Sequence, residues 1–170
     1  MKHNVLRPGI TNPNLWFPER PSKNEWNKIR KVVLDRDQHT CFYCGHRALK
    51  FMNVHHVEET AENEPENLVT VCAACHAVLH MGRNLSLGAI EIWQSEMSQV
   101  EIIQYTRKGV ASGCSLQEIK GGLPIKEGEF SPNSIEWANS LLANIGDKPR
   151  MSLPESLSAV FVSFVRWQIE

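Results

Sequence analysis

The sequence predicts a small α+β protein in which a short strand–strand–helix unit follows a leading helix and precedes a mainly helical C-terminal extension. Two Cys-x-x-Cys pairs flank the two expected strands and indicate a metal-bound fold. Short apolar runs between the pairs favour strands, whereas apolar residues recur at helical spacing before and after them. The 170 residues, 42% of them hydrophobic, suffice for one modest core.

The N-terminal part predicts an arm and then a helix. Residues 1–21 contain four prolines and little periodicity, so we expect an extended arm with Trp16 and Phe17 as docking anchors. Ser22 is followed three residues later by a glutamate, which is the pattern of a capping box. Apolar residues then recur at helical spacing, and a helix is expected over residues 23–37.

The middle of the chain predicts two strands and a helix. Residues 51–57 and 68–71 are short and apolar enough for strands, and a helix is expected over residues 73–81. Gly82 would end that helix. Gly45, directly after the first cysteine pair, favours a tight turn whose amides face a metal-bound sulfur.

The extension predicts one strand, a loop and three helices. The segment "LGAIEIW" alternates apolar residues like a strand, and Ser98 caps a helix expected over residues 99–108. Residues 109–131 are glycine-rich and are expected to form a loop. A third helix begins near Pro132, and a last helix follows Ser152. The residues of that last helix expected to pack inward are Leu157, Val160, Phe161 and Phe164.

The cysteines indicate zinc more strongly than disulfides. The N-terminus lacks the order of a secretory signal and no run of eighteen apolar residues occurs, so we expect a cytoplasmic protein without a membrane span. Reducing compartments keep thiols free, and four thiolates make a closed, structural zinc site. Two unrelated thiol pairs, an iron–sulfur site or a redox pair remain as alternatives. The expected ligands are Cys41, Cys44, Cys72 and Cys75, with Cys114 left as an inert thiol.

Four histidines indicate a second metal site. Neighbours on a strand point to opposite faces, so His55 and His56 would have different functions, whereas His76 and His80 are four apart and share one helix face. A site made by His55, His76 and His80 would keep open positions for water and substrate. His56 is then available as a general base. Taken singly, each histidine could instead be an ordinary surface or capping residue.

These motifs together resemble the HNH endonuclease family, also called ββα-metal or His-Me finger nucleases. The matching features are "CFYCG" with its lead-in "RKVVLDRDQHT", then "VHHV", Asn67 in "ENLVTVC", and "CAACHAVLH". They occur in order and cover residues 26–83. The resemblance implies three parts: an extended arm (1–21), a zinc-stapled ββα-metal module (22–84) and an extension of unknown role (85–170).

The resemblance also implies how the site acts. His55 and His76 would bind a catalytic divalent ion with His80 as third ligand, His56 would activate water, and Asn67 would hold the loop between the strands so that His56 is oriented. Family members hydrolyse DNA phosphodiester bonds to 5′-phosphate and 3′-hydroxyl ends. The expected cofactors are one structural Zn²⁺ and one catalytic ion, which is Mn²⁺, Ni²⁺, Zn²⁺ or Mg²⁺; imidazole ligands disfavour Mg²⁺.

A nuclease of this kind would bind double-stranded DNA through its backbone phosphates. The candidate contacts are basic residues within or next to the module, with a solvated face as the alternative for each. They are Lys28, Arg30, Lys31, Arg36, Arg47, Lys50 and Arg83. The basic excess is small, because residues 1–84 carry 11 Lys and Arg against 9 Asp and Glu.

A second resemblance suggests a protein of another class. The segment "LGAIEIWQSEMSQVEI" is similar to the one after the zinc knuckle in the DotN/IcmJ family, the HNH-derived zinc component of a type IV secretion coupling complex. That family uses the module for assembly and has lost the catalytic histidines, all four of which stand here. The alternative is thus a non-catalytic, zinc-stabilised adaptor with a protein partner bound through residues 85–170, which carry 7 Lys and Arg against 10 Asp and Glu.

Overall fold

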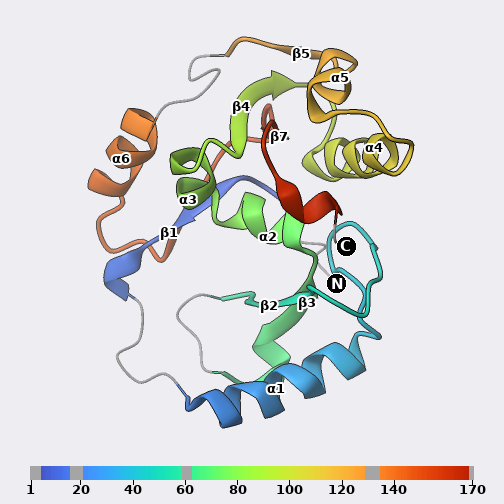
Figure 1. The fold of residues 1–170 in the computed structure, drawn as a ribbon. Coiled ribbons are helices and arrows are strands. Elements are labelled where there is room, and N and C mark those ends of the chain that lie inside the picture. Colours follow the sequence, from blue (N-terminus) through green and yellow to red (C-terminus); the bar gives the residue numbers. More distant parts are fainter. Residues whose placement is uncertain (1–4, 16–20, 59–62, 129–134, 169–170) are drawn as a thin grey trace.

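The computed structural model describes residues 5–15, 21–58, 63–128 and 135–168. Helices and short antiparallel strands alternate along the chain, which confirms the α+β class. Figure 1 shows α2 (Ala73–Leu79) near the centre, between the β2–β3 hairpin with α1 on one side and the sheet containing β4 and β7 on the other. No helix in the described ranges combines the length and apolarity needed to cross a bilayer.

The strand–strand–helix unit has the expected order. The strands β2 (Asn53–His56) and β3 (Leu68–Val71) pair antiparallel, with His55 opposite Val69 and His56 opposite Leu68. Helix α1 (Lys23–Arg36) begins at the predicted capping box and packs against both strands. Helix α2 follows β3 directly. This compact arrangement brings the residues after α1 next to the start of α2.

The C-terminal extension contains a three-stranded sheet in the order β5-β4-β7. Its central strand is β4 (Ile90–Ser95), close to the strand predicted from "LGAIEIW". Helix α4 (Gln99–Ala111) begins at the predicted capping box of Ser98 and continues three residues beyond the expected end. Helix α6 (Ile135–Ala143) lies close to the third predicted helix, although Ser131 and Pro132 fall outside the described residues.

The helix predicted after Ser152 is wrong, because Leu157–Phe161 forms strand β7. All five residues of β7 are buried. Strand β4 pairs with one edge of β7. The buried Gln99 side chain accepts a hydrogen bond from the Ala159 amide (2.7 Å) and donates one to the Ala159 carbonyl (3.0 Å). A five-residue apolar run does not distinguish a strand from a buried helix, so pairing with β4 decided the outcome.

The loop predicted over residues 109–131 is also partly wrong. Helix α5 (Leu116–Gly121) begins at a capping box formed by Ser115 and Glu118, and the two-residue strand β5 (Ile125–Lys126) pairs with β4. Gly82 does not end the helix before it but lies inside the short helix α3 (Met81–Ser86).

The N-terminal segment packs against the rest of the protein, whereas the sequence predicts an extended arm. Strand β1 (Gly9–Thr11) pairs antiparallel with β6 (Arg150–Ser152), and Leu6 and Ile10 are buried in the core. The pairing satisfies backbone groups of two segments that are far apart in sequence. The predicted anchors Trp16 and Phe17 lie outside the described residues.

One cluster of buried side chains connects the ββα unit with the extension. It includes Val78 of α2, Ile90 and Ile92 of β4 and Phe161 of β7. Each fully buried aliphatic or aromatic side chain contributes roughly 1.5–3 kcal/mol by leaving water. The hydrophobic core is therefore continuous across residue 84.

Candidate metal centres

The four cysteines of the two Cys-x-x-Cys pairs form one cluster. Cys41 and Cys44 lie in the turn after α1, Cys72 caps the N-terminus of α2, and Cys75 lies in its first turn. Their sulfur atoms all lie within 4.8 Å of one another, and those of Cys44 and Cys72 are 3.6 Å apart. Thiolates about 2.3 Å from a tetrahedral zinc ion are separated by about 3.8 Å. The cluster therefore fits a metal ion such as zinc.

Hydrogen-bond donors surround the Cys72 sulfur. The Cys75 amide donates to it at 3.4 Å, and the Arg107 guanidinium of α4 donates to it at 3.3 Å. On the other side of the cluster, Gly45 has a φ of 72°, and its amide bonds the Cys41 carbonyl at 3.0 Å. The predicted tight turn at Gly45 is confirmed, but its amide bonds a carbonyl and not a sulfur. The donors from Cys75 and Arg107 offset negative charge on the Cys72 sulfur.

The thiols also compete with one another for protons. Hydrogen bonds from Cys44, and then from Cys72 and Cys75, lower the pKa of Cys41. Hydrogen bonding with Cys41 raises the pKa values of Cys72 and Cys75. Four thiolates this close together, three of them buried, are thus unfavourable unless a cation lies among them. The two pairs form one cluster, so the alternative of unrelated thiol pairs is wrong. Cys114 is exposed and lies outside this cluster.

Three histidines form a second cluster, to which the short helix α2 also contributes. One ring nitrogen each of His55, His76 and His80 lies within 4.8 Å of the others. His55 extends from β2, His76 lies in α2, and His80 directly follows it. The His80 amide bonds the His76 carbonyl at 3.1 Å, which keeps the two residues one turn apart. The expected three histidines are therefore brought together.

Burial keeps these histidines neutral. Burial, followed by the charges of His80 and His76, lowers the pKa of His55 to about 2. Burial also lowers the pKa of His80 to about 3 and that of His76 to about 4, with further contributions from His76 and Arg150 for His80 and from Arg166 for His76. Neutral imidazoles have a free lone pair and are the form that binds metals.

The lowered pKa values make a prediction about acid stability. A buried histidine whose pKa lies below its unfolded value of about 6.5 contributes stability that is complete above pH 6.5 and is lost as the pH falls. With His76 at about 4, this loss amounts to about 1.4 kcal/mol per pH unit between pH 6.5 and 5. Urea denaturation of zinc-loaded protein without a second ion would measure it.

The matched comparison is His76→Gln, which keeps a polar side chain but does not titrate. We expect its free energy of unfolding to fall less steeply with decreasing pH than that of the unmodified chain. The two slopes should differ by about 1.4 kcal/mol per pH unit between pH 6.5 and 5. Parallel pH profiles for the two proteins would show that His76 is not held neutral by burial.

His56 lies next to His55 but outside the histidine cluster. Its Nε2 is 2.9 Å from the Asn63 side-chain oxygen, and its ring stacks on Trp26 of α1 with 6.0 Å between centroids. In this orientation of the amide, Nε2 donates and Nδ1 keeps its lone pair. Contacts from two sides thus fix the ring.

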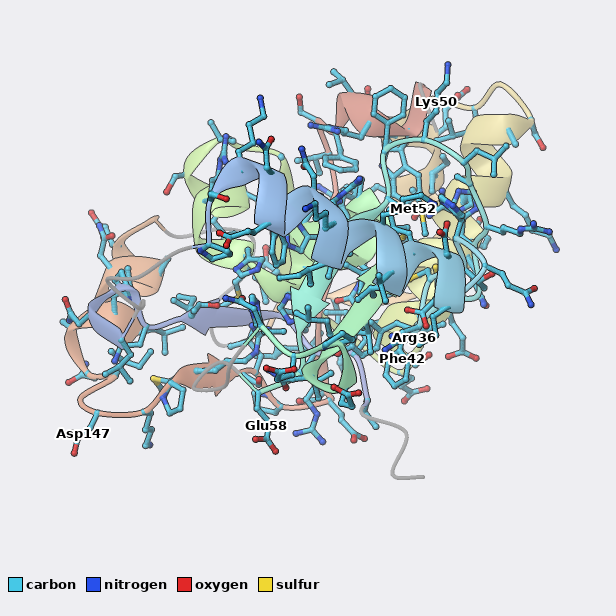
Figure 2. The ribbon with its side chains drawn as sticks, turned by 90° about the horizontal axis from the view of Figure 1, so that it is seen from below. Arg36, Phe42, Lys50, Met52, Glu58 and Asp147 are labelled. Carbon is cyan, nitrogen blue, oxygen red and sulfur yellow. The ribbon has the colours of Figure 1, made fainter. Side chains whose placement is uncertain are left out.

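Asn67 ties the two ends of the β2–β3 loop together. Its side-chain oxygen accepts from the Glu58 amide at 2.9 Å, and its side-chain nitrogen donates to the Glu58 carbonyl at 3.0 Å. Its own carbonyl accepts from the Val57 amide at 2.8 Å. These bonds hold the backbone directly after His56, while the Glu58 side chain is exposed and points outward in Figure 2.

The candidate phosphate contacts divide into two groups. Arg36 pairs with Asp37 and donates to two backbone carbonyls, Arg30 donates to the Met52 carbonyl, and Lys31 pairs with Asp35. These interactions stabilise α1 and its contacts with the hairpin. Within the described ranges, the other four are exposed and have no ion pair. They are Lys28, Arg47, Lys50 and Arg83.

A cavity of about 740 Å³ opens onto the histidine cluster. His76 and His80 line it together with Arg83 of α3 and Arg166 of the C-terminal segment. The space is large enough for part of a polymeric substrate, and it is continuous with the second candidate metal site. The sequence-based interpretation included Arg83 but missed Arg166.

Arg150 is another missed residue near the histidines. Its guanidinium donates to the Leu79 carbonyl at 2.6 Å, at the end of α2, and its charge lowers the pKa values of His55 and His80. No local motif marks it, because only the pairing of β1 with β6 brings residue 150 beside residues 79 and 80.

The fold and the two clusters define a class: an α+β protein with a ββα-metal fold and a four-cysteine cluster that fits zinc. The family model for HNH endonuclease matches residues 41–81. The chain is 34% identical over 85 residues to the "Probable HNH endonuclease" of Lactococcus phage SK1, covering 45% of this chain and 83% of that protein. The chain thus belongs to the HNH endonuclease family.

A second relative is a protein of a different name. The chain is 26% identical over 99 residues to "Type 4 apparatus protein DotN" of Legionella pneumophila, covering 55% of this chain and 46% of that protein. The chain spans less than half of the length of DotN. Both resemblances expected from the motifs are therefore confirmed as similarities.

Proposed function

We propose that this protein is a metal-dependent endonuclease that hydrolyses phosphodiester bonds in double-stranded DNA. The observation that carries the proposal is the convergence of His55, His76 and His80 beside a cavity, with His56 adjacent in the same strand. The relative named as a probable HNH endonuclease supports the same activity. An adaptor has no chemical need for this set of neutral imidazoles.

In this proposal the residues have distinct functions. His55, His76 and His80 hold a divalent ion, which supplies Lewis-acid stabilisation of negative charge on the phosphate and the leaving oxygen. His56 accepts a proton from the attacking water. Asn67 fixes the backbone after His56, and Asn63 and Trp26 hold the ring in place.

The four cysteines hold a structural zinc ion in the proposal, separate from the chemistry. Their ligand set is closed and leaves no position for substrate. The cluster joins the turn after α1 to the start of α2, and α2 carries His76. Zinc would therefore position the histidines without touching DNA.

The ligand set predicts a metal preference. Three imidazole nitrogens suit manganese, nickel or zinc better than magnesium, which prefers oxygen ligands. We expect initial rates of plasmid nicking to be higher with Mn²⁺ or Ni²⁺ than with Mg²⁺ at equal concentration. The His80→Ala variant should lose most of the advantage of Ni²⁺. Equal rates with all three ions would show that His80 is not a ligand.

A second candidate function rests on the similarity to DotN. That similarity covers 55% of this chain, and the C-terminal half is acidic. The candidate is a non-catalytic adaptor that uses zinc to fix a surface of residues 85–170 for a protein partner in an assembly such as a type IV secretion complex. If folded, zinc-loaded protein fails to nick DNA with every divalent ion added, that result would favour the adaptor.

A further inference from the structure

The C-terminal segment ends in a short turn that is anchored beside the cysteine cluster. The 3-10 helix η3 (Val165–Gln168) carries Trp167, which is only 6% exposed. Trp167 packs against Phe161 of β7 at 5.1 Å between centroids. The Arg107 guanidinium lies 4.9 Å from the Trp167 ring and also bonds the Cys72 sulfur. This anchor fixes the backbone of the residues directly before Trp167.

Arg166 is the neighbour of this anchor, yet its side chain is exposed. It lines the cavity that also contains His76 and His80. Its charge lies close enough to His76 to oppose protonation of that ring. Among the described residues, no carboxylate forms an ion pair with it; its guanidinium carbon lies 5.8 Å from the centre of the Phe51 ring.

A cation in this position is unfavourable in the free protein. It lies near His76, one of the three imidazoles that are proposed to hold a divalent ion, so positive charges would accumulate at one end of the cavity. A bound anion would offset this charge. Guanidinium groups bind phosphate oxygens through paired N–H donors, with a geometry that lysine lacks.

We propose that Arg166 binds a backbone phosphate of the nucleic acid at the histidine site, so that the C-terminal extension completes the substrate-binding surface of the ββα module. The inference rests on the proposed nuclease function for its substrate. Figure 2 shows Lys50, the residue before Phe51, beside η3, and Arg83 lines the same cavity. In this proposal, the sugar–phosphate backbone of the nucleic acid runs from α3 past the histidines to the C-terminal turn.

The test uses the full, zinc-loaded chain with Arg166→Ala and Arg166→Lys, and with Lys126→Ala as the control. Lys126 is exposed on β5 and lies outside the residues that line the cavity, so its variant removes the same charge elsewhere. Binding to a labelled DNA duplex is measured over a range of salt concentrations without added divalent ion. Plasmid nicking with Mn²⁺ is measured in parallel.

We expect Arg166→Ala to make the plot of log affinity against log salt shallower by about 1, as loss of one phosphate contact does. Nicking should slow by ~10²-fold or more, with Arg166→Lys intermediate and Lys126→Ala unchanged. If the unmodified chain nicks DNA and both Arg166 variants match Lys126→Ala, the inference is wrong while the nuclease function stands.

Absence of nicking separates the two proposals in a different way. If the chain binds the duplex with an Arg166-dependent salt slope but does not nick plasmid with any ion, the phosphate contact is supported and the nuclease function is wrong. If the chain neither binds nor nicks DNA, both are wrong.

Discussion

Replacing His56 with alanine is expected to slow plasmid nicking by ~10²- to 10⁴-fold, the usual contribution of a general base. The variant should remain folded, because His56 is half-buried and lies outside the histidine cluster and the cysteine cluster. Water would still reach the phosphate, but no side chain would remain at this position to accept its proton. Single-turnover nicking of supercoiled plasmid with Mn²⁺ measures the effect.

The matched control is another histidine of the same module. His39 has a φ of 54°, a conformation that asparagine tolerates, so His39→Asn changes a histidine with little backbone strain. We expect this control to nick plasmid at close to the unmodified rate. Equal losses in both variants would indicate damage to the fold, and an unimpaired His56→Ala variant would assign the base to another residue.

Replacing Cys72 with alanine is expected to have the largest effect on stability. Cys72 is fully buried, caps α2 and receives hydrogen bonds from Cys75 and Arg107. Structural zinc contributes on the order of 10 kcal/mol to the folding of small modules, which matches the whole stability of a typical domain. The variant should therefore lose both its zinc and its cooperative unfolding transition.

Cys114→Ala is the control for that experiment. Cys114 is exposed and lies outside the cluster, so its removal should leave zinc content and melting temperature unchanged. Zinc content by atomic emission and thermal denaturation followed by circular dichroism give the two readouts. A Cys72→Ala variant that retains one zinc ion per chain and melts like the control would contradict the zinc-stapled fold.

Local signals in the sequence predicted most of the ββα unit. The capping boxes at Ser22 and Ser98 placed the starts of α1 and α4, because these hydrogen bonds form within one helical turn. Cysteine spacing predicted the first cluster, and the four-residue spacing of His76 and His80 predicted part of the second. The capping box at Ser115 is a signal of the same kind for α5, in a segment whose glycine content predicts a loop.

Long-range pairing explains what the sequence did not predict. Strand β7 looked like a helix until its partner β4 and the Gln99 side chain were known. Likewise, Arg150 and Arg166 approach the histidines only because distant segments dock against α2. Such contacts depend on the whole topology and leave no local pattern. The proposed functional surface is therefore broader than the segment of residues 41–81 matched by the family model.

The most direct test of the nuclease proposal is nicking of supercoiled plasmid by the purified, zinc-loaded chain, with a chelator arm and re-addition of Mn²⁺ or Ni²⁺. We expect open circular product with 5′-phosphate ends that disappears on chelation and returns with the added ion. No nicking with any divalent ion, from protein shown to be folded and to contain one zinc per chain, would contradict the nuclease function and favour the adaptor.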